Sequence, residues 1–196
     1  MENKLVLFDF DGTLTRKDTL LHFILYTQGI WRTAVGFIFL SPFIVSWKLG
    51  LLNNHAAKQR VLQYFFGGQK LTNFNEQCVS FASEKISKLV RANAIVLLEQ
   101  FKRENARVVV VSASPENWVK PWCDTWNIEC IATKLEVQQG VLTGKIDGLN
   151  CYGRQKEVRV REAIDLTDYS TVVAYGDTRG DKELLAMASE AHYREL

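Results

Sequence analysis

Three short, largely apolar runs, each ending in polar residues, constrain the fold of this chain most. They cover residues 5–10, 108–111 and 171–175, and they end at Asp11-Gly12, Ser112-Ala113-Ser114-Pro115 and Gly176-Asp177. Continuous apolar strands are typical of a parallel sheet that is covered on both faces. Segments with helical spacing lie between them, at residues 94–104, 116–126 and 156–164. We therefore predict an α/β fold with a doubly wound parallel sheet and an active site at the carboxyl edge of its strands.

Two further segments complete the predicted organisation. Residues 135–149 contain Gly140, Gly144 and Gly148 and predict a β-hairpin. Residues 18–87 show helical periodicity, with breaks at Gly29, Gly50 and Gly67-Gly68. We read this region as roughly four helices inserted after the first strand. The predicted division is a catalytic core of residues 1–17 and 88–196, and a helical cap of residues 18–87.

Composition excludes several classes of protein. The chain of 196 residues is 47% hydrophobic and 23% charged, which is the balance of a folded globular protein. Its net charge of +2 comes without a long basic run, so we predict no nucleic-acid partner. The four cysteines form no CxxC pair, and the N-terminus has no signal-peptide pattern. These features favour a cytoplasmic protein without disulfides or zinc.

Asp9 and Asp11 lie two positions apart where the first predicted strand ends. Two carboxylates this close repel each other unless a cation neutralises them, and Mg²⁺ prefers oxygen ligands. One carboxylate can then attack phosphorus while the other acts as acid and base. Gly12 would let the backbone approach a phosphate closely. The alternative for the carboxylate pair alone is an ordinary capped turn after a strand.

Three other groups are each unremarkable alone but can serve the same chemistry. Ser112 lies before a predicted helix start, whose free N–H groups can bind phosphate oxygens. Lys156 opens the helix after the hairpin and could neutralise a phosphoryl group. Asp177 and Asp181 follow the third strand and would complete a metal site.

Taken together and in this order, the four groups resemble the motifs of the haloacid dehalogenase superfamily. The stretch 9–14 is similar to its first motif, Ser112 to its second, Lys156 to its third and the stretch 176–181 to its fourth. The run Ser-Ala-Ser-Pro-Glu, the Leu-Thr-Gly-Lys hairpin and the position of the insertion resemble subfamily IB, the phosphoserine phosphatase-like branch. The resemblance covers nearly the whole chain and implies a Rossmann-like sheet with an inserted helical cap.

The resemblance also implies roles for individual residues. Asp9 would be the nucleophile, and Asp11 would protonate the leaving alcohol and then activate water. Ser112 and Lys156 would hold the phosphoryl oxygens. The implied Mg²⁺ ligands are Asp9, Asp11 through its backbone carbonyl, Asp177, and Asp181 in a supporting position. The implied substrate contacts are Gly12, Thr13, Asp18, Lys58, Ala113 and Ser114. Asp11 favours a phosphatase over a dehalogenase, which has no leaving alcohol to protonate.

The predicted function is hydrolysis of a small phosphomonoester, phosphoserine-like or other, through a phosphoaspartate. Phosphoserine itself fits less well, because Asp18 stands where phosphoserine phosphatases carry Glu and Lys58 where they carry Arg, with Arg60 nearby. One alternative is a phosphotransferase that passes phosphate to a second alcohol. Another is a non-catalytic module that reads a phosphorylated partner, which the intact set of motif residues disfavours.

The apolar stretch 33–47 bears on the substrate. It is shorter than the roughly 20 residues that span a bilayer, and it contains Pro42, so we predict no membrane-spanning helix. It could form a buried helix pair, in the cap or at a dimer contact. It could instead rest on a bilayer, with Trp31 and Trp47 as anchors and Arg32 and Lys48 facing headgroups. The second case would suit a lipid phosphatase of the phosphatidylglycerophosphate type. By contrast, Trp118, Trp122 and Trp126 are spaced by four and are predicted to pack in the core.

Overall fold

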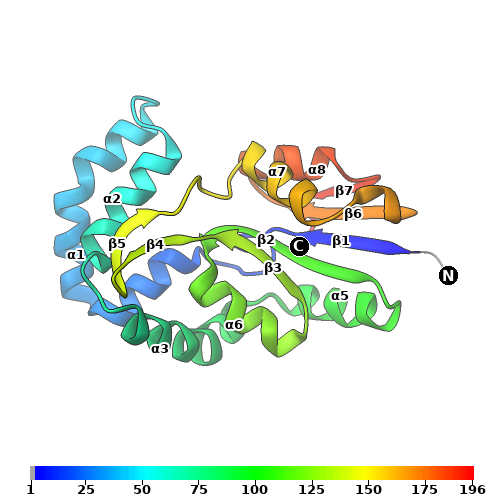
Figure 1. The fold of residues 1–196 in the computed structure, drawn as a ribbon, viewed down its shortest axis with the longest axis horizontal. Helices are drawn as coiled ribbons and strands as arrows, with labels where there is room; N and C mark the ends of the chain where they lie inside the picture. The colour runs from blue at the N-terminus through cyan, green and yellow to red at the C-terminus, as the bar shows by residue number, and fades with distance from the viewer. Residues whose placement is uncertain (1–2) are drawn as a thin grey trace.

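Five parallel strands form the central sheet of the computed structural model, which describes residues 3–196 (Figure 1). Their order in the sheet is β3-β2-β1-β6-β7, with β1 in the middle. The strands are β1 (Lys4–Phe8), β2 (Arg107–Pro115), β3 (Glu129–Thr133), β6 (Thr171–Gly176) and β7 (Glu190–Tyr193). All pairings are parallel, and β1 pairs with β2 on one side and β6 on the other. The predicted doubly wound α/β fold is confirmed.

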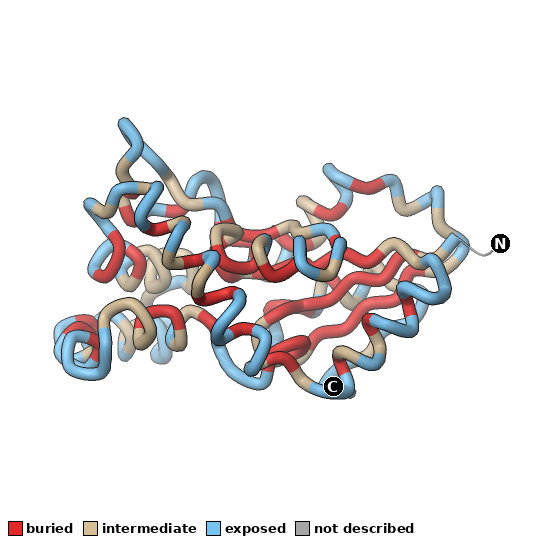
Figure 2. The backbone as a smooth tube through the Cα atoms, turned by 90° about the horizontal axis from the view of Figure 1, so that it is seen from below, coloured by how far each residue is buried: buried red, intermediate tan, exposed pale blue. Residues whose placement is uncertain are grey.

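Helices cover both faces of this sheet, as Figure 1 shows. Helices α5 (Ala92–Arg103) and α6 (Glu116–Trp126) lie on one face, and α7 (Arg154–Ala163) and α8 (Lys182–Ala186) on the other. Alternate residues of β1 enter the two layers: Val6 and Phe8 join one apolar cluster, whereas Leu5 and Leu7 join the other. Buried backbone therefore runs through the middle of the molecule (Figure 2). Trp118 and Trp122 of α6 are buried, as predicted, and Trp126 is partly buried and packs against the same apolar cluster.

The inserted helices gather beyond one end of the sheet, the edge to which the carboxyl end of β1 points (Figure 1). They are α1 (Thr19–Lys48), α2 (Asn54–Phe66) and α3 (Leu71–Phe81), followed by a π-helical turn (Ala82–Ile86) and the short α4 (Ser87–Leu89). Asp18 caps α1 by accepting a hydrogen bond from the backbone of Leu21. The breaks predicted at Gly50 and Gly67-Gly68 lie between helices. At Gly29 the chain leaves helical geometry, with φ of 72°, so α1 is two helical segments joined by a kink.

The second segment of α1 is buried on one side only. Only Thr33, Gly36 and Leu40 are buried there, on the side that packs against α2. Gly36 permits this contact, because a Cβ at this position would lie 2.4 Å from the ring of Phe65. This segment is not the fully buried helix pair that the sequence allowed. By length and composition alone, Thr19–Lys48 could cross a membrane, a test that core helices of soluble proteins also pass.

Pro42 lies inside this segment without ending it. Proline has no N–H, so the carbonyl four residues earlier, that of Ile38, loses its helical partner. The hydroxyl of Ser41 donates to that carbonyl at 2.7 Å and replaces the missing bond. The helix continues past Pro42 to Lys48.

An aromatic cluster joins the inserted helices to the core. The ring of Phe23, in α1, lies 4.7 Å from that of Trp118 in α6 and 5.1 Å from that of Phe81 in α3, measured between centroids. Phe66 and Phe74 complete the cluster around it. These rings exclude water between the helices and the sheet.

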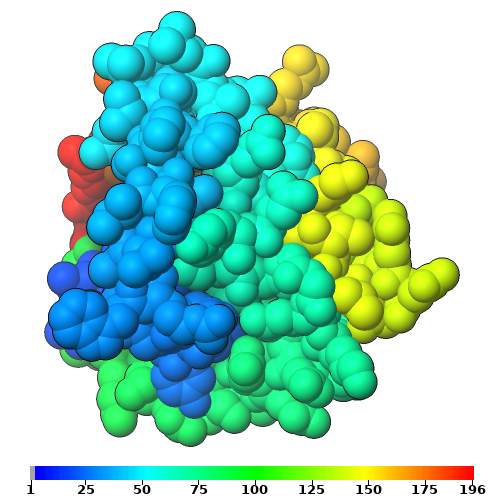
Figure 3. Space-filling view, turned by 90° about the vertical axis from the view of Figure 1, so that its left-hand side faces the viewer, coloured from blue at the N-terminus to red at the C-terminus, as the bar shows by residue number. Residues whose placement is uncertain are grey.

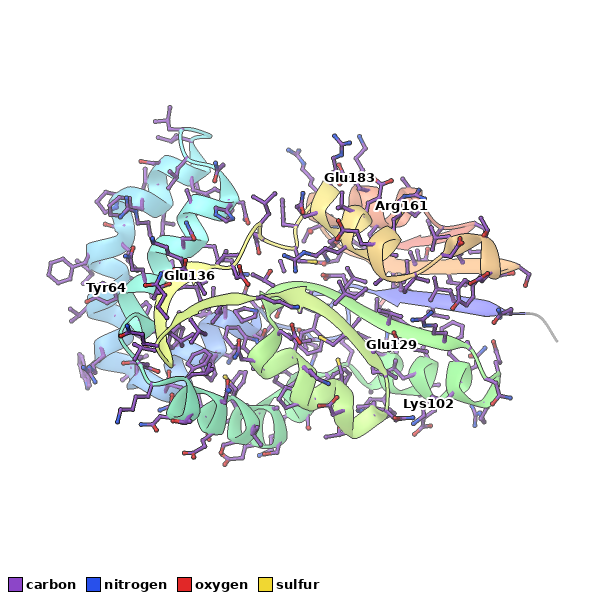
Figure 4. The ribbon with its side chains drawn as sticks, in the orientation of Figure 1. Tyr64, Lys102, Glu129, Glu136, Arg161 and Glu183 are labelled. Carbon is purple, nitrogen blue, oxygen red and sulfur yellow. The ribbon has the colours of Figure 1, made fainter. Side chains whose placement is uncertain are left out.

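The predicted hairpin consists of β4 (Leu135–Gln138) and β5 (Val141–Ile146) and lies against α2. The Ile146 N–H donates to Gln59 at 2.9 Å, and Gly68 and Leu142 bond through their backbones. Gly144 is required by the close approach, because a Cβ there would lie 2.3 Å from the Cα of Gln63. Figure 4 shows Tyr64 of α2 and Glu136 of β4 at the same end of the molecule. Two short 3₁₀ turns, Leu166–Asp168 and Arg179–Asp181, complete the fold.

We expect Phe23→Ala to lower the free energy of unfolding by about 3–5 kcal/mol, because it leaves a cavity among four rings. Urea denaturation monitored by circular dichroism measures this loss. Phe39→Ala is the matched control on the same helix: its ring is 67% exposed, so its effect should stay within about 0.5 kcal/mol. Equal losses of unfolding free energy in the two variants would contradict a stabilising role for the aromatic cluster.

Candidate active site

Asp9, Lys156 and Asp181 form a buried cluster at the carboxyl edge of the sheet. Asp9 follows β1, and its N–H donates to the Tyr175 carbonyl of β6. Lys156, in the first turn of α7, donates to Asp9 Oδ1 and, at 2.6 Å, to Asp181 Oδ1. All three side chains are at most 8% exposed. An ammonium is this deeply buried only when carboxylates pair with it.

Burial and charge set the protonation of this cluster. Burial raises the pKa of Asp9 to about 7, although the Lys156 ammonium acts in the opposite direction. Burial also disfavours the charged form of Lys156, but Asp9 and Asp181 outweigh it and raise the pKa of this lysine. Burial acts to raise the pKa of Asp181, but the charge of Lys156 and the hydrogen bonds from Lys156 and Thr178 together outweigh it, so the pKa of this carboxyl is lowered. Asp9 therefore needs further positive charge to be fully ionised near neutral pH.

Asp11 connects the core to the first inserted helix. Its Oδ1 accepts a hydrogen bond from the Thr19 N–H at 2.6 Å, and its Oδ2 accepts one from the Ser114 hydroxyl at 2.5 Å. Burial raises the pKa of Asp11, and the charge of Asp18 adds to this rise. A carboxyl group held on both oxygens in this way is oriented for proton transfer.

The loop after Asp11 is shaped around Asp177. Gly12 has φ of +92°, and a Cβ there would lie 2.4 Å from Asp177 Oδ2. The Thr13 hydroxyl donates to Asp177 Oδ1 at 3.2 Å, and Arg91 donates to the Gly12 carbonyl at 3.0 Å. Burial raises the pKa of Asp177, and the negative charge of Asp181 adds to this rise. Gly12 is therefore needed for Asp177 to come this close to the loop.

The acidic residues here fit a hard divalent cation. Asp9, Asp177 and Asp181 each offer a carboxylate oxygen, and these oxygens lie within 4.8 Å of one another. An all-oxygen set suits Mg²⁺ better than softer metals. Both carboxylate oxygens of Asp181 already have hydrogen-bond partners within the protein. Its Oδ2 accepts hydrogen bonds from the N–H and hydroxyl of Thr178, and its Oδ1 accepts one from Lys156. Asp9 and Asp177 are the members best placed to bind a cation directly.

The loop at the end of β2 lies beside Asp11. Ser112 is fully buried, and its hydroxyl accepts a hydrogen bond from the Ser114 N–H at 3.0 Å. Lys58 reaches this loop from α2 and donates to the Ala113 carbonyl at 2.7 Å. Burial lowers the pKa of Lys58, although Asp11 and Asp18 oppose the shift. Helix α2 thus places a lysine near Asp11 and Asp18.

A cavity of about 650 Å³ opens above this cluster. Its polar end is formed by Asp9, Asp11, Lys156, Asp181, Ser114 and Lys58. Its other wall is apolar and comes from the inserted helices, with Leu20, Leu21, Ile24, Phe37, Ile44, Trp47 and Val61. The cavity therefore has charged side chains at one end and an apolar wall at the other.

The chain belongs to the haloacid dehalogenase-like hydrolase family, whose model matches residues 6–186. Protein CicA of Caulobacter vibrioides is 33% identical over 195 residues, which cover 98% of this chain and 86% of that protein. Among solved structures, a protein of unknown function from Bordetella pertussis Tohama I has a TM-score of 0.84, with 20% identity over 96% of this chain and 88% of that one. A substrate-bound phosphoserine phosphatase has a TM-score of 0.66, with 20% identity over 98% and 86%. The predicted superfamily and the phosphoserine phosphatase-like fold are confirmed.

The structure brings together most of the residues singled out from the sequence. Asp18 also lines the cavity, where it caps α1. Within the described chain, Gly12, Thr13 and Asp177 line a separate small hollow, and Ser112 lies beneath the cavity wall. Sequence reasoning missed Thr19, Arg91 and Tyr152, the last of which lines the cavity. Only Thr19 carried a signal, since it follows a helix-capping aspartate.

Gly12→Ala should weaken Mg²⁺ binding, because the new Cβ displaces the Asp177 carboxylate. We expect the rise in melting temperature on adding Mg²⁺ to shrink or vanish in this variant. Gly140→Ala is the matched control: Gly140 has φ of +77° but nothing within 4 Å of the added carbon. Both variants should lose about 1–2 kcal/mol of stability from the left-handed backbone. An unchanged response to Mg²⁺ in Gly12→Ala would contradict the role of this contact.

Proposed function

We propose that this chain is a Mg²⁺-dependent phosphomonoester hydrolase that acts through a phosphoaspartate at Asp9. The observation that carries the proposal is the buried Asp9 carboxylate, paired with Lys156 and facing a cavity in which the Asp11 carboxyl lies beside it. Within residues 3–196, those that line this cavity include no histidine and no cysteine, so neither a serine–histidine nor a cysteine–histidine pair is among them. A carboxylate nucleophile with a neighbouring acid fits acyl phosphate chemistry.

The reaction would proceed in two displacements. In the first, an oxygen of Asp9 bonds to phosphorus, the ester P–O bond breaks, and the departing alkoxide takes the proton of Asp11. In the second, water attacks phosphorus and gives a proton to Asp11, the P–O bond to Asp9 breaks, and inorganic phosphate leaves. Both steps need orientation and charge neutralisation more than any other assistance.

The remaining residues would hold the phosphoryl group. Lys156 would neutralise its charge while keeping Asp9 in place. Ser112 and the backbone N–H groups of the β2 loop would bind phosphoryl oxygens. Bound by Asp9, Asp177 and the Asp11 carbonyl, with Asp181 behind them, Mg²⁺ would supply positive charge to the carboxylates and the phosphoryl oxygens.

Residues 18–87 would act as a cap that closes the site and selects the substrate. Asp18 and Lys58 lie in the cavity wall next to the catalytic end, beside Ser114. A single lysine that already binds the Ala113 carbonyl is a weaker carboxylate partner than a bidentate arginine. The proposed substrate class is therefore a small organic phosphate rather than phosphoserine in particular. We place the enzyme in the cytoplasm.

Asp9→Asn should abolish Mg²⁺-dependent hydrolysis of an aryl phosphate, because an amide cannot form the phosphoenzyme. Asp11→Asn should slow both steps by about 10²–10⁴-fold, the usual contribution of a general acid or base. Steady-state kinetics measure turnover, and acid quenching with labelled substrate measures the phosphoenzyme.

Asp124→Asn is the matched control, because this exposed aspartate pairs with Lys120 on the surface of α6, away from the cavity. It should leave turnover unchanged. Near-normal activity of Asp9→Asn would refute the mechanism. Assays with and without an added acceptor alcohol separate hydrolysis from the alternative phosphotransferase, in which the alcohol takes the phosphate of Asp9 in place of water.

A lipid phosphate is the second candidate substrate, as in a phosphatidylglycerophosphate phosphatase. The observation that favours it is the apolar wall of the cavity, to which Phe37, Ile44 and Trp47 contribute from α1. A phosphoserine-sized molecule would leave this wall without contacts. An alkyl or acyl chain would cover it while its phosphate reached Asp9.

For monomeric alkyl phosphates we expect kcat/KM to rise with chain length, by up to about fourfold per buried methylene. Ile44→Asn should remove much of this rise, because Ile44 lines the cavity. Val45→Asn, at the neighbouring position that is 52% exposed, should preserve it. If kcat/KM is flat across chain lengths while aryl phosphate is hydrolysed, the apolar wall does not select the substrate and the small-phosphate proposal stands.

A further inference from the structure

The outer side of α1 carries a stripe of apolar side chains that no other element covers. Trp31, Ile38 and Val45 are spaced by seven, so they lie above one another on the helix, and they are 83%, 71% and 52% exposed. Val35 and Phe39 widen the stripe and are 48% and 67% exposed. Thr33, Gly36 and Leu40 lie on the opposite, buried side. We call Trp31, Val35, Ile38, Phe39 and Val45 the outer stripe.

Helix α1, which carries the stripe, lies at the end of the molecule opposite the start of β1 and runs beside α2 and α3 (Figure 3). Isolated apolar residues on a surface are ordinary, but a contiguous patch of large ones marks an interaction site. Trp47 is 41% exposed and also lines the catalytic cavity, so the cavity and this end of the molecule meet at its side chain.

The charge around the stripe indicates what covers it. Residues 19–75 contain five Lys or Arg and no Asp or Glu, whereas the rest of the chain has 19 Lys or Arg and 22 Asp or Glu. Four of these cations are exposed: Arg32, Lys48, Arg60 and Lys70. The Arg60 guanidinium lies 5.2 Å from the ring centre of Phe43, on the same segment of α1 as the stripe. Arg32 and Lys48 lie on α1 itself, near the two ends of the stripe, and exposed cations beside large apolar side chains are complementary to an anionic lipid surface.

We propose that α1 docks the protein on an anionic phospholipid bilayer, with the outer stripe in the headgroup and upper acyl region. The helix would lie flat on the membrane, because the stripe runs along its length and its other side is fixed to α2 through Gly36 and Phe65. A second copy of this chain is the less favourable occupant, since pairing two such faces would oppose like charges. The docking does not depend on which phosphate ester is hydrolysed.

Co-sedimentation of the full chain with vesicles tests the proposal. The chain should bind vesicles made of equal parts phosphatidylcholine and phosphatidylglycerol, and bind less well to phosphatidylcholine alone. Ile38→Ser with Phe39→Ser should lower the affinity at least about tenfold, because two large side chains no longer insert. Arg32→Gln and Lys48→Gln should each lower it about fivefold on the anionic vesicles only.

Val96→Ser with Leu149→Ser is the matched control, because these side chains are 59% and 53% exposed but lie outside the cap. It should bind vesicles as the unchanged chain does. Aryl phosphate hydrolysis in the absence of lipid should be the same in all these variants, and Asp9→Asn should still bind vesicles. The docking and the catalytic proposals can therefore fail independently.

Three results would overturn the docking proposal. The first is an absence of binding to either kind of vesicle. The second is equal loss of affinity in the Ile38-Phe39 variant and its control. The third is a dimer in sedimentation velocity, without lipid, that Ile38→Ser with Phe39→Ser converts to a monomer; this result would make a second copy the occupant.

Discussion

The ammonium of Lys156, held between Asp9 and Asp181, is the interaction on which the rest of the site depends. Burial by itself favours the neutral form of all three groups, and the opposite charges counteract it: the carboxylates raise the pKa of Lys156, and Lys156 acts to lower the pKa of both carboxyls. The three residues come from a strand end, a helix start and a 3₁₀ turn. The ion pairs therefore fix three chain segments relative to one another as well as their charges. Asp181 also fixes the loop after β6, because its second oxygen accepts the hydrogen bond that caps the 3₁₀ turn at Thr178.

The parts of the fold that could be predicted are those that short sequence patterns determine. Strands β1, β2 and β6 are continuous apolar runs, and parallel strands place Asp9, Ser112 and Asp177 at a common edge. The contacts of Thr19 and Arg91 could not be predicted, because they depend on where the chain crosses between sheet and inserted helices. The exposure of α1 could not be predicted either, because it depends on tertiary packing. The same apolar sequence is compatible with a helix that is covered on one side and with one that is covered on both.

Helix α1 has two apolar sides with different surroundings. Phe37 and Ile44 face the cavity, while Ile38 and Val45, one position later in each case, face outward. At about 100° per residue, adjacent positions in a helix point in clearly different directions. One segment can thus line the cavity and form the outer surface at the same time.

The hairpin β4–β5 has a mechanical consequence for any opening of the site. Two connections, the loop before α1 and the segment after α4, run side by side and are joined by Thr15 and Val90. Alone, these two connections would act as a hinge for the inserted helices. The hairpin adds a second link, because it is hydrogen-bonded to α2 and to the turn after α2 while both of its ends connect to the core. The inserted helices are therefore tethered at two places. Rotation of the inserted helices about the hinge must therefore break the hydrogen bonds to the hairpin or move the hairpin with them, which favours small tilts over a wide swing.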